Sequence, residues 1–159
     1  MNSKKINRRA LREKSLQILY AYEMNKDRIE LLTEGLLSDV ESAADRLFCK
    51  NLINTVTRYA PDLDKMISDR VANWEMDRIA LIDKLLIRIG ICELLYFPDI
   101  PPKVSINEVI EIAKDYSTQK SGKFINGILD AVLNELKTSG KLNKFGRGLI
   151  DITLPKKPA

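Results

Sequence analysis

Apolar residues recur with helical spacing along nearly the whole chain. They fall three or four positions apart from about Asn7 to Met24, from Leu31 to Leu37 and from Leu47 to Tyr59. This spacing places them on one face of an amphipathic helix, and no segment before residue 137 shows the alternation typical of a strand. The pattern therefore predicts an all-α fold.

Prolines divide the next segments. Pro61 is predicted to end the third helix, because an interior proline removes a backbone hydrogen bond, and a fourth helix then runs from about Asp62 to Trp74. The segment from Ile79 to Leu95 is apolar over well over a third of its circumference, which predicts a central position. Three prolines in residues 98–102 end it.

Two more helices complete the pattern. Ser105 and Glu108 form a capping-box pattern that is predicted to open a helix reaching Tyr116. The last helix is predicted from about Ser121 to Leu136, followed by a loosely ordered basic tail. A glycine inside this helix, Gly127, costs about 1 kcal/mol relative to alanine, and we expect close approach of a neighbouring helix to compensate.

Four basic residues share one side of the first helix, at positions i, i+3, i+4 and i+7: Lys5, Arg8, Arg9 and Arg12. Further along the helix the same side becomes apolar. One face cannot be both charged and buried. We therefore expect the first turns to project from the body and to offer this basic stripe to an acidic partner.

The basic residues gather at the two ends of the chain. Residues 1–14 hold six Lys or Arg against one Glu, and residues 137–159 hold six against one Asp, a net charge of +5 in each case. Residues 15–136 hold fourteen basic and twenty acidic residues, a net of −6, which brings the total to +4. Such asymmetry favours nucleic acid or an anionic membrane surface as a partner. Solvated termini are the ordinary alternative, but the helical register of the basic residues at the N-terminus favours binding.

The composition argues against several classes of catalytic site. The chain has no histidine and two separated cysteines, Cys49 and Cys92, so Ser-His pairs, Cys-His pairs and histidine metal sites are excluded. Gly146 and Gly148 match neither a P-loop nor a dinucleotide fingerprint. No apolar run is long enough to span a bilayer or to form a secretory signal. We expect a cytoplasmic, non-enzymatic protein without metal or cofactor.

Ten short blocks of sequence, in order, resemble one known family. They cover residues 8–13, 16–20, 73–74, 78–84, 86–88, 93–96, 99–101, 103–108, 110–114 and 123–130. Together they resemble the NusB family of bacterial transcription antitermination factors. The resemblance implies about seven helices in one domain over residues 1–136, with subdomains of about 1–72 and 73–136, and a tail over 137–159 that has no counterpart.

The resemblance also implies a function and partners. Members of the family pair with NusE, a small-subunit ribosomal protein. The two together hold the boxA element of nascent ribosomal RNA leader transcripts and load an antitermination complex onto RNA polymerase. This role requires no catalysis, which agrees with the composition.

Several residues match positions that the family uses for RNA. The resemblance implies RNA contacts for the arginine-rich start of the first helix, for a tyrosine on the same helix and for two lysines near the last helix: Arg8, Arg9, Arg12, Tyr20, Lys120 and Lys123, with Lys5 extending the stripe. An arginine fork suits phosphates and base edges. Two ordinary explanations stay open: core packing for Tyr20 and a solvated loop for Lys120.

The resemblance places the protein partner at the start of the central helix. Asp77 and Asp83 match acidic positions there and are expected to meet basic groups of NusE, although the helix dipole alone also favours acids in a first turn. Lys103, Asn107 and Glu108 belong to a strong block of the family, but we do not assign them to the site, because capping accounts for Glu108.

Two other functions fit the same sequence. One is a helical protein-interaction adaptor without an RNA role. The other is the N-terminal RNA-binding fragment of an RNA cytosine methyltransferase, since the same helical domain occurs fused to such enzymes. The sequence also leaves open whether the free protein is a monomer or a homodimer.

Overall fold

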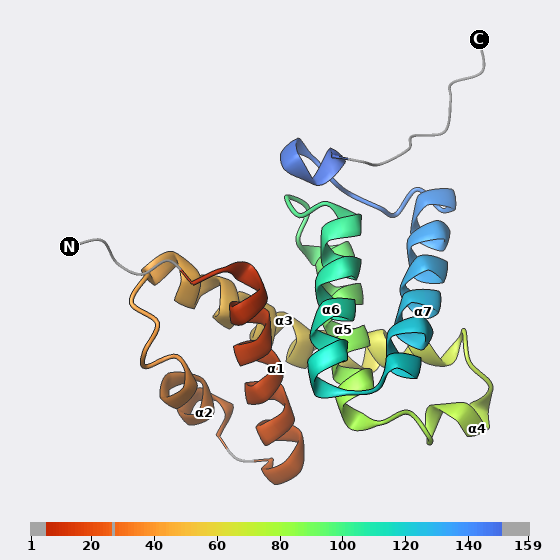
Figure 1. The fold of residues 1–159 in the computed structure, drawn as a ribbon. Coiled ribbons are helices and arrows are strands. Elements are labelled where there is room, and N and C mark those ends of the chain that lie inside the picture. The colour runs from red at the N-terminus through yellow and green to blue at the C-terminus, as the bar shows by residue number, and fades with distance from the viewer. Residues whose placement is uncertain (1–5, 27, 151–159) are drawn as a thin grey trace.

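The computed structural model describes residues 6–26 and 28–150, and over these residues it contains helices and no strand (Figure 1). The helices are α1 (Arg8–Asn25), α2 (Ile29–Leu36), α3 (Ala43–Ser68), α4 (Asn73–Met76), α5 (Leu81–Tyr96), α6 (Pro102–Tyr116), α7 (Gln119–Thr138) and the 3-10 helix η1 (Gly146–Leu149). The all-α prediction is confirmed. Within the same residues, no helix combines the length and apolar character needed to cross a membrane.

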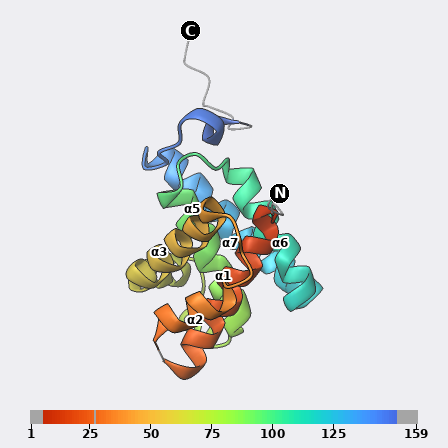
Figure 2. The ribbon, with the colours of Figure 1, turned by 90° about the vertical axis from the view of Figure 1, so that its left-hand side faces the viewer.

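Helix α5 forms the centre of the core, as its apolar circumference predicted. It packs against α1, α3, α6 and α7, and eleven of its residues are buried. In Figure 1, α1 and α2 lie on one side of it, while α6 and α7 run side by side on the other. Figure 2 shows the same arrangement from the side of α1 to α3. The proposed division into two subdomains stays a prediction.

Helix α3 continues through Pro61, so the predicted break at this residue is wrong. The helix runs from Ala43 to Ser68 with Pro61 inside it. An interior proline costs about 3 kcal/mol. However, Pro61 itself is exposed, while Val56 before it and Leu63 after it are 1% and 0% exposed. Burial of apolar side chains on both sides of the proline therefore outweighs its local cost.

The start of α6 and the role of the helix glycines also differ from prediction. Helix α6 begins at Pro102, and Ser105 lies inside it instead of capping it. A Cβ on Gly127 would meet nothing within 4 Å, whereas a Cβ on Gly90 would lie 2.8 Å from Leu129 Cδ1 of α7. The glycine that allows close helix approach is therefore Gly90 on α5, which lets α7 pack against the central helix.

A buried ion pair joins the first helix to the central one. Arg12 of α1 and Glu93 of α5 are 2% and 0% exposed. Arg12 donates from Nε to Glu93 Oε2 at 2.8 Å and from Nη2 to Oε1 at 2.7 Å, and Ser105 of α6 donates to Oε1 at 2.8 Å. Burial opposes the charge on Arg12, but the hydrogen bond and charge of Glu93 outweigh it and raise the pKa of the guanidinium. One carboxylate thus holds three helices together.

The described part of the C-terminal segment is anchored, although a loosely ordered tail was predicted there. Lys144 is 9% exposed, and its Nζ donates to the backbone oxygens of Glu93 and Phe97 at 3.0 and 2.8 Å. These carbonyls lie at the end of α5, where each also accepts a backbone hydrogen bond, from the nitrogens of Phe97 and Ile100 respectively. A Cβ on Gly148 would overlap the carbonyl oxygen of Pro98, so only glycine fits. Residues 151–159 of the predicted tail lie outside the described residues.

The buried pair predicts a strong coupling in stability. Arg12→Met and Glu93→Gln should each lower the free energy of unfolding by about 3–5 kcal/mol, because each leaves a buried charge without its partner. The double variant Arg12→Met/Glu93→Gln should recover part of the summed loss, and Ser105→Ala should cost only about 1 kcal/mol. Urea unfolding midpoints measure these values. Single variants that cost less than Ser105→Ala would contradict the role given to the pair.

The buried position of Lys144, bonded to the end of α5, predicts that the stability of the fold depends on pH. Burial lowers the pKa of Lys144 to about 8 from its ordinary value of 10.5. Between these pH values the unfolded chain binds more protons at this site than the folded chain. The stability of the wild type relative to Lys144→Met should therefore rise by up to about 3 kcal/mol from pH 8 to pH 10.5. Denaturant unfolding of both proteins from pH 8 to pH 10.5 measures this difference in stability. If the two curves of unfolding free energy against pH run parallel, Lys144 is not buried in solution.

Candidate nucleic-acid and partner interface

The exposed arginines of α1 lie in its first turn. Asn7 caps the helix, since its Oδ1 accepts a hydrogen bond from the backbone nitrogen of Ala10 at 2.8 Å. Arg8 follows at once and is exposed, with its guanidinium carbon 4.0 Å from the centroid of the Phe48 ring on α3. This contact holds the guanidinium in place while leaving donors of its fork in solvent.

Arg9 is exposed but already paired. It donates from Nε and Nη2 to the two carboxylate oxygens of Glu108 on α6, at 2.8 and 3.1 Å, and its side chain is 46% exposed. An exposed ion pair of this kind contributes little to stability, because water screens the attraction between the two charges. A phosphate can therefore replace Glu108 as the partner of Arg9 at little cost in stability.

Arg12 does not belong to an exposed basic stripe, and this part of the prediction is corrected. Its guanidinium is bonded to Glu93 in the core, so a phosphate contact would require opening a buried ion pair. Arg8, Arg9 and Arg12 do lie on one helix, as their spacing predicted, but spacing alone does not show that the distant Glu93 lies opposite Arg12. Lys5, the first member of the predicted stripe, lies outside the described residues. The stripe is thereby reduced to Arg8 and Arg9 in the described part of the chain.

Tyr20 is exposed and is not a core residue. Its side chain is 38% exposed, so core packing does not account for it. It lies eleven residues after Arg9 on α1, which corresponds to about 16 Å along the helix. A role for Tyr20 as a stacking platform stays a prediction, and it would belong to a part of the surface separate from the two exposed arginines.

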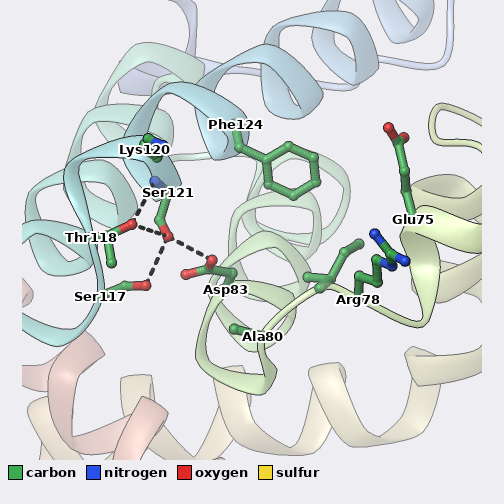
Figure 3. Close-up of a pocket in the computed structure, with 10 residues that line it drawn as sticks. Glu75, Arg78, Ala80, Asp83, Ser117, Thr118, Lys120, Ser121 and Phe124 are labelled. Atoms are coloured by element: carbon green, nitrogen blue, oxygen red, sulfur yellow. Dashed lines mark hydrogen bonds between the residues drawn. The ribbon is translucent and has the colours of Figure 1, made fainter.

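A pocket opens where the start of α5 faces the start of α7 (Figure 3). It has a volume of about 430 Å³. Figure 3 shows Asp83 under Ser121, Phe124 across from them, and Glu75 and Arg78 on the opposite side. The pocket therefore combines carboxylates, hydroxyl groups, cations and an aromatic ring. Lys120, one of the lysines predicted to bind RNA, also lines it.

Asp83 and Asp77, the two predicted partner residues, differ in exposure. Asp83 is 7% exposed, and its Oδ2 accepts a hydrogen bond from Ser121 Oγ at 2.7 Å. Its Oδ1 is buried and has no hydrogen-bond partner within the described residues. An unpaired buried acceptor is costly, so Asp83 is suited to receive a donor from outside the chain. Asp77 is exposed in the turn that follows α4.

The two predicted RNA lysines lie on α7 itself. Lys120 was expected in a loop, but α7 begins at Gln119, so Lys120 stands in its first turn. A lysine there opposes the helix dipole, so the fold does not account for its charge. Lys123 is exposed on the next turn and lines a groove between α6 and α7.

The sequence alone did not single out Glu93 in the core, and two exposed residues of α6 were left out of the site. Glu93, which holds Arg12, could have been suspected because it is the only charged residue after Arg88 in the most apolar helix. Lys103 and Asn107 were left out of the site, yet both are exposed on α6 and line a groove facing α7. Capping does not involve them, because α6 starts before Ser105.

Comparisons with known proteins agree with this fold. The NusB family model matches residues 9–134. Transcription antitermination protein NusB of Chloroherpeton thalassium is 49% identical over 153 residues, covering 95% of this chain and 72% of that protein. The structure of T. maritima NusB is 32% identical with a TM-score of 0.77, covering 82% of this chain and 93% of that one.

A second solved structure shares the fold at lower identity. It contains antitermination factors NusB and NusE in complex with dsRNA, and the matched chain is 22% identical with a TM-score of 0.73, covering 80% of this chain and 96% of that one. The match of the family model over most of the chain, together with a relative at 49% identity, establishes the relationship. The chain belongs to the NusB family.

Proposed function

We propose that this chain is a transcription antitermination factor. In this proposal it binds boxA-type single-stranded RNA of nascent ribosomal RNA leaders together with ribosomal protein NusE, and it helps assemble an antitermination complex on RNA polymerase. Relatives carrying the name transcription antitermination protein support this function. The role needs no catalytic residue, and its site is the cytoplasm, where transcripts are made.

The observation that carries the proposal is the position of Arg8 and Arg9. Both are exposed at the start of a helix whose next arginine, Arg12, is fixed in the core. The first turn of α1 contains no acidic residue. A rigid helix start with two accessible guanidinium groups is suited to phosphates of single-stranded RNA, because the fork binds two oxygens at once.

The protein partner is proposed to bind at the pocket formed by α5 and α7. The unpaired Oδ1 of Asp83 and the exposed carboxylate of Asp77 are suited to basic side chains of NusE. A basic group that reaches Asp83 would pair a buried acceptor, and a charge-assisted hydrogen bond of this kind is stronger than a neutral one. The pocket at Asp83 and the exposed arginines would then serve different partners.

The exposed arginines predict the salt dependence of RNA binding. Two phosphates neutralised on single-stranded RNA contribute about −1.4 to the slope of log K against log salt. Arg8→Ala/Arg9→Ala should remove about this amount when binding to boxA-type RNA is measured in a salt series with NusE present. Arg58→Ala, which removes one guanidinium beside the Tyr59 ring on α3, is a single-charge control and should keep the wild-type slope. An unchanged slope in the double variant would place the RNA elsewhere.

The pocket at Asp83 predicts a separate effect on the protein partner. Asp83→Asn removes the charge, while the amide oxygen can keep the hydrogen bond from Ser121. We expect weaker association with NusE, by about tenfold or more, and unchanged RNA binding by the isolated chain. Asp62→Asn, on α3, is the control, and isothermal titration calorimetry is the measurement. Wild-type affinity of Asp83→Asn for NusE would remove Asp83 from the interface.

A further inference from the structure

A groove runs between α6 and α7, and several exposed polar residues line it. Two hollows form it, and they meet at Asn107 of α6 and Asn126 of α7, which line both. The two helices are antiparallel neighbours joined by a short turn (Figure 1). The groove therefore extends along their common length, from the start of α6 to the turn before α7.

The rim of the groove is basic. Its lining includes four lysines against one aspartate, Asp130. Lys103 and Lys123 are exposed, and no ion pair within the described residues involves them or Lys137. Lys114 is the exception, because Glu111 accepts a hydrogen bond from it at 2.6 Å. Three lysines along the groove are thus available to phosphates.

The centre of the groove is neutral and rich in amides. Asn107 and Asn126 are exposed, and their side chains have no hydrogen-bond partner within the described residues. Buried apolar residues, Ile106 at 4% and Leu133 at 8% exposed, line the same hollow beneath them. Asparagine side chains pair with base edges, and apolar surface accepts the faces of bases. Lysines at the rim and amides in the centre suit a nucleic-acid strand better than a folded acidic protein.

The groove also connects the two parts of the surface that were predicted to bind RNA. Glu108, which binds Arg9, and Lys103 lie on the first turns of α6, so the start of α1 is next to one end of the groove. Lys120 lies in the first turn of α7, at the other end. From Lys103 to Lys114 the distance along α6 is about 16 Å. A strand held at both ends would have to cross this length.

We propose that the α6–α7 groove holds a stretch of single-stranded RNA, with its phosphates on Lys103, Lys123 and Lys137 and base edges on Asn107 and Asn126. This inference rests on the proposed function, because it extends the RNA surface of the same protein. It adds Lys103, Lys137 and the two asparagines to the residues that the sequence suggested.

The test separates phosphate contacts from base contacts. Lys103→Gln/Lys137→Gln should reduce the slope of log K against log salt by about 1.4 for boxA-type RNA. Asn107→Ala/Asn126→Ala should leave this slope unchanged but weaken binding about tenfold and reduce the preference for boxA-type over scrambled RNA. All four residues are on helix surfaces, and circular dichroism should report wild-type helix content.

The matched control is Lys26→Gln/Lys65→Gln, which removes two lysines with 63% and 75% exposed side chains, away from the groove. It should keep the wild-type slope. The proposal is overturned if the groove lysine variant keeps the wild-type slope, or if the asparagine variant keeps wild-type affinity and preference. The proposal is also overturned if either groove variant loses NusE binding while its RNA binding stays intact. Wild-type chain that binds no RNA with NusE present would instead refute the proposed function.

Discussion

The buried ion pair between Arg12 and Glu93 is the interaction on which the arrangement of the molecule depends. The Glu93 side chain accepts hydrogen bonds from Arg12 of α1 and Ser105 of α6, and its backbone oxygen accepts one from Lys144. A carboxylate removed from water requires such partners, since burial of an unpaired charge is very costly. One residue of the central helix therefore fixes the first helix, the sixth helix and the C-terminal segment.

This pair also determines which charges reach the surface. Because Arg12 is fixed to the core, the first turn of α1 lies across α6, and Arg9 meets Glu108 there. A second ion pair joins the central helix to α3. Arg88 of α5 donates from Nε and from Nη2 to the two carboxylate oxygens of Asp64, each at 2.7 Å. The exposed basic residues of α1, α6 and α7 thus sit on a rigid frame, and one of them, Lys120, also lines the pocket at Asp83.

The sequence predicted local structure well because helical periodicity is a local property. The helix starting beside Asn7 and the central position of α5 followed from the spacing and number of apolar residues. The errors arose where distant contacts decide. Pro61 stays inside α3 because both flanking turns are buried, and Lys144 is anchored by carbonyls 47 and 51 residues away in sequence. Nothing in the neighbouring sequence encodes those partners.

In the candidate site, too, sequence predicts what depends on local spacing and fails where distant contacts decide. Arg8, Arg9, Lys120 and Lys123, which the family resemblance proposed for RNA, are all exposed, although Lys120 lies on α7 and not in the predicted loop, and their role stays a prediction. The resemblance could not separate Arg12 from them, because a buried and an exposed arginine have the same spacing. Asp83 is likewise buried beneath Ser121, a contact across 38 residues that periodicity does not report.

The most direct test of the account follows the arginine side chains during RNA binding. In NMR spectra of the ¹⁵N-labelled chain with NusE, the Nε–Hε signals of Arg8, Arg9 and Arg12 can be observed while boxA-type RNA is added. The account predicts that the signals of Arg8 and Arg9 shift, while that of Arg12, bonded to Glu93 at 2.8 Å, stays in place and exchanges slowly with solvent. An Arg12 signal that shifts like the other two, or exchanges rapidly in the free protein, would contradict it.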